Sequence, residues 1–143
     1  MINQQTLNGT KMPTPKTQHI MFSGIPHNAR LQVFYHHLYE FKKGLRNLVL
    51  TTESTESRKA IEDRLLKDNI AYIIHEIGAN KINVFFGNKS CIDVVSTLNS
   101  RLNKLTPEQD FMLGIMLGYD RLKQCDRYLK IKSNGMLKDT LIG

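Results

Sequence analysis

The sequence has few cysteines and no long apolar runs. Its two cysteines, Cys91 and Cys125, lie far apart, and residues 1–18 are polar and lack the apolar stretch that a secretory signal peptide requires. No window approaches the roughly 20 apolar residues that a membrane-spanning helix needs. We therefore expect a cytoplasmic protein with reduced thiols and no contact with a membrane.

The common motifs for metal binding, nucleotide binding and catalysis are also missing. No two of the five histidines have the i, i+4 spacing of a metal site on a helix. Residues 86–90, where a strand is expected to lead through Gly87 into a helix, lack the pattern of a phosphate-binding loop, and Asn88 and Ser90 fit as helix caps. We expect no bound metal or cofactor, and no catalytic residue can be named.

The length and the charge of the chain are more informative. A chain of 143 residues, 41% of them hydrophobic, is long enough for one domain with a single core. Its 20 basic and 13 acidic residues give a net charge of +7. Most of the excess lies in residues 1–46, and it would attract an anionic partner such as nucleic acid, an acidic protein or a phosphorylated ligand. The same charge can also simply keep a small domain solvated.

Hydrophobic periodicity predicts the order of the elements. A polar tail at residues 1–19 is followed by a helix that begins near Asn28 and ends at Gly44. A strand within residues 45–52, a helix ending at Lys67, and strands at residues 71–77 and 81–86 come next. The turn at residues 78–80 favours an antiparallel hairpin. The second hairpin strand is apolar on both faces, which predicts a central position in the sheet.

These elements predict an α+β fold in a single domain at residues 20–132. We expect a small mixed or antiparallel sheet of three to four strands, built on a central βαββ unit and packed with helices on at least one face. A further helix is expected from Asn88 or Ser90 to about Leu102. Residues 133–143 are expected to form a loose C-terminal tail.

The run at residues 105–120 predicts a long helix. Thr106 fits as the N-cap, Pro107 suits the first helical position, and Gln109 completes a capping box. The helix is expected to contain Gly114 and Gly118 and to continue to about Lys132.

Two glycines one turn apart would share a face of that helix. Each costs about 1 kcal/mol relative to alanine, so another element or a partner is expected to approach closely. Asp120 and Arg127 would share a side of the helix and hold a buried polar network or a recognition site. Our candidate recognition or close-packing surface consists of Gly114, Gly118, Tyr119, Asp120 and Arg127.

The end of the first predicted helix combines an aromatic residue with three cations. We interpret Tyr39, Lys42, Lys43 and Arg46 as a partner-binding surface for carboxylates or phosphates, in which the guanidinium group can form two parallel hydrogen bonds. Alternatively, these cations only stabilise the helix end through the helix dipole, by about 0.3–1 kcal/mol, and Gly44 terminates the helix.

Three ordered motifs carry a resemblance to a known family. They are YEFKKGLRNLVL at residues 39–50, NVFFG at residues 83–87, and LTPEQDFMLGIMLGYD at residues 105–120, which is followed by QCDRY. Through them the chain resembles an uncharacterised bacterial family of small proteins, a domain of unknown function. The resemblance implies a compact α/β domain without an established activity, often encoded beside a flavodoxin. Because flavodoxins are acidic electron carriers, it also implies a flavodoxin-like acidic partner.

Three classes of function remain open. The first is an accessory or regulatory protein-binding domain for an acidic redox protein such as a flavodoxin. The second is a nucleic-acid-binding protein, in which exposed aromatics such as Tyr35 or Tyr39 would stack on bases. The third is a small enzyme of unknown reaction that uses Asp110, Asp120 and Cys125, which requires a pocket that joins them. The first helix or the glycine face would also support a homodimer.

Overall fold

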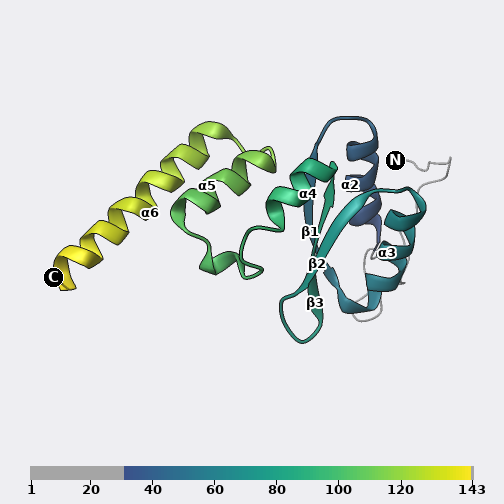
Figure 1. The fold of residues 1–143 in the computed structure, drawn as a ribbon, viewed down its shortest axis with the longest axis horizontal. Helices are drawn as coiled ribbons and strands as arrows, with labels where there is room; N and C mark the ends of the chain where they lie inside the picture. Colours follow the sequence, from purple (N-terminus) through teal and green to yellow (C-terminus); the bar gives the residue numbers. More distant parts are fainter. Residues whose placement is uncertain (1–30, 143) are drawn as a thin grey trace, which may run out of the picture.

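The computed structural model describes residues 31–142, with side chains described as far as residue 135 (Figure 1). The tail predicted at residues 1–19 and the predicted cap Asn28 lie outside this part of the chain. No helix in the described part is long and apolar enough to cross a membrane.

The described part of the chain contains five α-helices and three strands. In chain order they are α2 (Gln32–Lys42), β1 (Leu48–Ser54), α3 (Arg58–Lys67), β2 (Ala71–Glu76), β3 (Lys81–Gly87), α4 (Lys89–Val95), α5 (Pro107–Met116) and α6 (Arg121–Ile142). Two 3₁₀ turns lie at Thr55–Ser57 and Leu102–Lys104.

The three strands form one antiparallel sheet in the order β1–β3–β2. Helix α3 connects β1 to β2, and a short turn joins β2 to β3, so the predicted α+β fold with its βαββ unit is confirmed. The central position of β3 is also confirmed. Six of its seven residues are buried, because its side chains face helices on both sides of the sheet.

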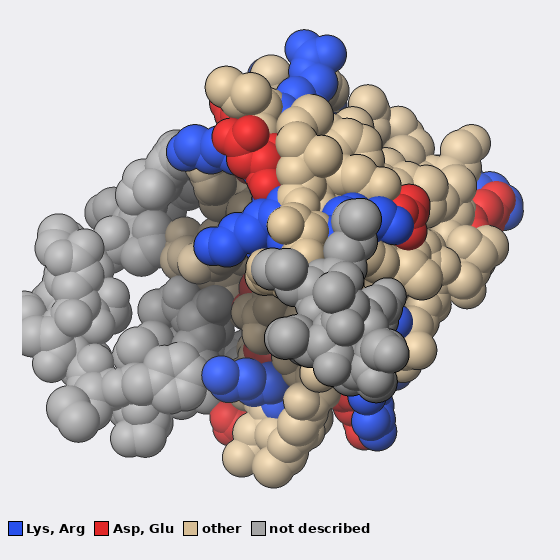
Figure 2. Space-filling model, turned by 90° about the vertical axis from the view of Figure 1, so that its left-hand side faces the viewer, with Lys and Arg blue, Asp and Glu red and all other residues tan. Residues whose placement is uncertain are grey.

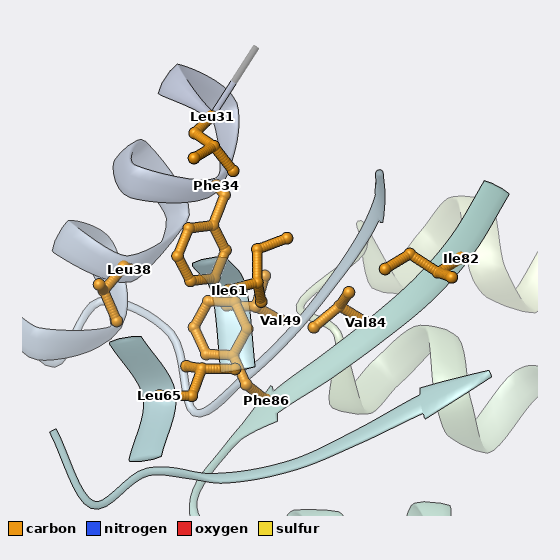
Figure 3. Packing of buried hydrophobic residues seen from close by; sticks show 9 residues of the cluster. All are labelled: Leu31, Phe34, Leu38, Val49, Ile61, Leu65, Ile82, Val84 and Phe86. Carbon is orange, nitrogen blue, oxygen red and sulfur yellow. The ribbon is translucent and has the colours of Figure 1, made fainter. Parts of the chain in front are cut away.

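Each face of the sheet carries its own hydrophobic cluster. Helices α2 and α3 lie on one side, and α4 and α5 lie on the other (Figure 1). On the first side the ring of Phe34 meets the ring of Phe86 edge-on, with 5.6 Å between centroids. This first cluster contains Leu31, Phe34, Leu38, Val49, Ile61, Leu65, Ile82, Val84 and Phe86 (Figure 3). The second contains Leu48, Phe85, Ile92, Val95, Leu113 and Leu117.

The run at residues 105–120 starts a helix as predicted. The hydroxyl of Thr106 accepts a hydrogen bond from the backbone N–H of Gln109, and the Gln109 side chain accepts one from the N–H of Thr106, both at 3.1 Å. Pro107 occupies the first helical position. The predicted capping box is therefore confirmed.

The prediction of one helix from Thr106 to Lys132 is wrong, because the chain turns at Gly118. This glycine has a φ of +84°, and the N–H of Tyr119 donates to the carbonyl oxygen of Gly114 at 3.0 Å. Such an arrangement ends a helix and requires a left-handed residue, which glycine adopts without strain. The Asp120 carboxylate then accepts from the N–H of Lys123 at 2.9 Å and caps α6.

Helices α5 and α6 therefore form a hairpin, and Gly114 and Gly118 do not share a face of one helix. Close packing at Gly114 is nevertheless found. A Cβ atom at this position would lie 1.8 Å from the buried side-chain nitrogen of Gln124 on α6. The second correction concerns the end of the chain, because α6 continues to Ile142 where a loose tail was expected from residue 133.

Replacement of Gly114 by alanine is expected to lower the free energy of unfolding by about 1–3 kcal/mol, because the new methyl group overlaps Gln124. In a Gln124→Ala background the same change should be neutral or stabilising, since alanine favours a helix by about 1 kcal/mol over glycine. Urea denaturation of the four proteins measures this coupling. An equal penalty in both backgrounds would show that Gln124 is not its cause.

Candidate interaction surface at the end of helix α2

A cavity of about 590 Å³ opens where three segments meet beside the end of α2. It is lined by residues 41–42 of α2, residues 68–71 between α3 and β2, and residues 87–89 at the junction of β3 and α4. Its charged lining residues are Lys42, Asp68 and Lys89. The fold thus places one of the predicted partner-binding lysines next to the Gly87 junction, which is 45 residues away in the sequence.

Lys42 is held in place by an acidic residue of the cavity. Its ammonium nitrogen lies 2.6 Å from Asp68 Oδ2, and Arg64 Nε donates to the same oxygen at 2.8 Å. Burial opposes ionisation of Asp68, but the hydrogen bonds from Lys42 and Arg64 outweigh it and hold the pKa of this carboxyl below its usual value. Lys42 therefore has a structural partner as well as an exposed position.

Arg46 is also engaged within the molecule. Its guanidinium lies 2.8 Å from Nδ1 of His37 and 3.3 Å from Oε1 of Glu40. Burial lowers the pKa of His37, and the positive charge of Arg46 lowers it further. A neutral His37 accepts the hydrogen bond from Arg46. The guanidinium group, which we predicted to bind a partner, therefore forms contacts that hold the loop after α2 against the helix.

Lys43 and Tyr39 remain on the surface. The Lys43 ammonium lies over the Tyr39 ring, 5.5 Å from its centroid, and neither Lys43 nor Tyr39 has an ion pair or side-chain hydrogen bond among the described residues. The Tyr39 side chain is 56% exposed, and nearby Leu45 is 69% exposed. Exposed aromatic residues are typical of protein-binding surfaces, and the exposed leucine adds apolar area beside Tyr39.

Lys89 enters this surface from the other side of the cavity. It is exposed, and among the described residues its ion-pair partner is Asp93, one turn away on α4, at 3.0 Å. Exposed pairs of this kind contribute little to stability. We define the α2-end surface as Tyr39, Lys42, Lys43, Leu45 and Lys89. Sequence reasoning missed Leu45 and Lys89, although a leucine directly after a helix-ending glycine is a signal that could have been noticed.

The wall of the cavity depends on a close backbone approach at Gly87. A Cβ atom at Gly87 would lie 2.2 Å from the carbonyl oxygen of Asn47. That oxygen accepts from the N–H of Asn88 at 2.9 Å, and the two asparagine side chains are hydrogen-bonded at 3.1 Å. The motifs at residues 39–50 and 83–87 therefore meet here. Glycine is required at position 87 because a side chain would collide with the Asn47 backbone, and because other residues rarely adopt a φ of +155°.

The second predicted group has mainly a structural role. Gly114 packs against Gln124, Gly118 forms the turn, and Asp120 caps α6. Arg127 forms two exposed hydrogen bonds to Asp110 across the hairpin, at 2.8 and 3.0 Å, so Asp120 and Arg127 do not form a buried polar network with each other. The remaining member of the group, Tyr119, is exposed.

The residues considered for an enzyme do not converge. Asp110 pairs with Arg127, Asp120 is a helix cap, and Cys125 is exposed on α6. None of the three lines the cavity beside α2.

The other titratable groups of the sheet do not form an acid–base pair either. Burial raises the pKa of Glu53 although Thr51 donates to it, and burial lowers the pKa of His75. Glu53 is opposite Ile82, whereas His75 is opposite Asn83, so their side chains lie on opposite faces of the sheet. Within the described residues, no group of three potential metal ligands occurs.

Many cations in the described part have acidic neighbours. Pairs one turn apart run along α3 and α4, for example Lys59 with Asp63 and Lys89 with Asp93. On the face seen from the C-terminal end of α6, basic side chains lie beside acidic ones (Figure 2). The net charge alone therefore overstates the positive field, and the positions of individual lysines matter more.

Fold and surface together define a small α+β domain with a three-stranded antiparallel sheet and an exposed, lysine-bearing surface at the end of α2. A family model described as "Protein of unknown function (DUF2023)" matches residues 32–131. The chain belongs to this family, and the match runs from the start of α2 well into α6. A comparison with curated proteins finds no match.

Replacement of Gly87 by alanine is expected to lower the free energy of unfolding by about 3 kcal/mol or more, because the methyl group meets backbone atoms that have no room to move. Gly78→Ala is the control, since a Cβ atom there has no neighbour within 4 Å. Urea denaturation should separate the two variants clearly. Similar small losses in both would contradict the close contact between Gly87 and Asn47.

The half-buried position of His37 beside Arg46 predicts a pH dependence of stability. The pKa of His37 in the folded protein lies below its ordinary value of 6.5. As the pH falls through 6.5, the unfolded chain therefore binds a proton at this residue more readily than the folded protein does, and the free energy of unfolding decreases. His37→Asn does not titrate and keeps an acceptor for Arg46, so it should lose less stability between about pH 7.5 and about pH 5. Urea denaturation across this range measures the difference. The same slope in both proteins would contradict the assignment.

Proposed function

We propose that the protein is a cytoplasmic accessory domain that binds an acidic protein through the α2-end surface. The observation that carries this proposal is the cavity beside the end of α2, which Lys42 and Lys89 line from two segments. Lys43, Tyr39 and Leu45 are exposed at the same end of α2, outside the lining of the cavity. Lys42, Lys43 and Lys89 provide positive charge, and Tyr39 and Leu45 provide apolar area that water would leave on binding.

The chemistry of the cavity favours a carboxylate-bearing partner. Lys42 and Lys89 line it from two sides, and Asp68 is the acidic residue in its wall. Asp68 is already neutralised by Lys42 and Arg64. An incoming carboxylate therefore gains the attraction of Lys89 and Lys43 with little repulsion from the wall.

A flavodoxin is the first partner to test. The family resemblance implies a flavodoxin gene neighbour, and an acidic carrier matches a surface built from lysines. Because interactions between exposed charges are screened by salt over about 8–10 Å, binding should weaken as the salt concentration rises.

The charge-reversed variant Lys43→Glu/Lys89→Glu should bind flavodoxin about tenfold more weakly, which corresponds to about 1.4 kcal/mol. Calorimetric titration at low and moderate salt measures this change. Lys42 is left in place because its loss would leave Asp68 with a single partner.

The matched control is Lys59→Glu/Lys81→Glu. Lys59 pairs with Asp63 one turn away as Lys89 pairs with Asp93, at 3.1 and 3.0 Å, and Lys81 is exposed on β3. The control should change the affinity less than about twofold. Equal losses in both double variants, or no binding to the wild type, would reject the proposal. Binding to a mixed-sequence single-stranded oligonucleotide that Lys43→Glu/Lys89→Glu abolishes would favour the nucleic-acid function instead.

A further inference from the structure

One side of helix α6 packs against helix α5. Gln124 is buried against Gly114, Arg127 pairs with Asp110, and the Tyr128 hydroxyl donates to Glu108 at 2.9 Å. These three residues point toward α5, which is the main packing partner of α6. Beyond α5 the helix extends away from the sheet (Figure 1).

The opposite side of α6 carries an uncovered apolar stripe. At about 100° per residue, Leu122, Cys125 and Leu129 fall within about 60° of one another and face away from the side that meets α5. Leu122 is 71% exposed, Leu129 is 62% exposed, and Cys125 is exposed and not in a disulfide. Their spacing of three and four residues is that of a seam between two helices.

Cations flank this stripe on both sides. Lys123 and Lys130 follow one edge, and Arg121 and Lys132 follow the other. Lys132 pairs with Glu108 at 3.0 Å, whereas Arg121, Lys123 and Lys130 have no ion pair among the described residues. Asp126 is the one acidic residue between Arg121 and Lys132, and it lies between the stripe and the edge that Lys123 and Lys130 follow. Four cations against one acid leave the flanks of the stripe positive.

The charges beside the stripe distinguish three possible binding partners, which are a second copy of α6, a membrane surface and another protein. Two copies of α6 packed along this stripe would bring Lys123 and Lys130 of each copy toward the cations of the other, which disfavours self-association. A membrane surface calls for a broader apolar face with large aromatic or aliphatic side chains, and this stripe offers two leucines and a cysteine. An apolar groove lined by carboxylates matches both the stripe and its flanks.

We propose that α6 is a second docking surface, which inserts Leu122 and Leu129 into the apolar groove of an acidic protein. This proposal goes beyond the function proposed for the α2-end surface, because it concerns a different helix, and α4 and α5 lie between α2 and α6 in the view of Figure 1. The protein would then contact acidic partners through two separate surfaces, and each contact can be lost without the other.

A designed peptide with complementary chemistry tests this surface directly. The probe is a synthetic amphipathic helix with leucine at heptad positions and glutamate at the flanking positions, and its control has lysine in place of glutamate. The acidic peptide should bind the wild type at least tenfold more tightly than the basic one. In the complex, alkylation of Cys125 by N-ethylmaleimide should slow at least fivefold. Half-buried Cys91 on α4 serves as the internal reference.

Leu122→Ser/Leu129→Ser should weaken binding of the acidic peptide at least tenfold. The matched control is Val33→Ser/Leu66→Ser, which removes two exposed apolar side chains from α2 and α3 and should leave the affinity unchanged. Lys43→Glu/Lys89→Glu should also leave it unchanged, so that failure at α6 and failure at the α2-end surface are seen separately.

Three results would overturn the proposal. One is equal binding of the two peptides, or binding that Leu122→Ser/Leu129→Ser does not weaken. Another is a wild-type dimer in sedimentation that this variant abolishes, since a second copy would then be the occupant. The last is cosedimentation with vesicles of anionic phospholipid that the same variant abolishes, because the surface would then be a membrane contact.

Discussion

Strand β3 contributes residues to both hydrophobic clusters, and the helices on both faces of the sheet pack against it. Phe86 faces α2 and α3, whereas its neighbour Phe85 faces α4 and α5. Because side chains alternate along a strand, a shift of one residue in its pairing would exchange the two faces and bury the wrong set of neighbours. The contact of Asn47 with Gly87 and Asn88 fixes this pairing at one end of the strand.

The described cations divide into those that hold the fold together and those that remain available. Lys42 and Arg64 neutralise Asp68, and Arg46 fastens the loop after α2 to His37 and Glu40. Lys43 and the cations of α6 do not contribute ion pairs of this kind, apart from Arg127 and Lys132. The net charge of the chain therefore does not describe its surface, because many of the described lysines and arginines have an acidic partner within the fold.

The sheet was predictable from the sequence because its signals are local. Apolar residues on both faces of residues 82–86 require a central strand, and Thr106 and Gln109 start a helix through contacts three residues apart. The break at Gly118 was missed because the apolar pattern continues past it, although glycine followed by a capping aspartate is a signal for one helix ending and another beginning. The α2-end surface could be predicted only in part. Lys89 joins this surface, and Asp68 joins the cavity beside it, from segments that are distant in the sequence. Local periodicity gives no signal for contacts of this kind.

The contact between Gly114 and Gln124 also determines the direction of α6. Gly114 is buried beside Leu113, which anchors α5 to the sheet, and Gln124 fits where a side chain is missing. If the two helices slid past one another by a turn, the amide of Gln124 would lose its recess and meet a side chain instead. The hairpin therefore has one preferred alignment. At about 1.5 Å for each of its 22 residues, α6 is more than thirty ångströms long. The absence of a side chain at Gly114 therefore determines the direction in which this long helix extends from the rest of the protein.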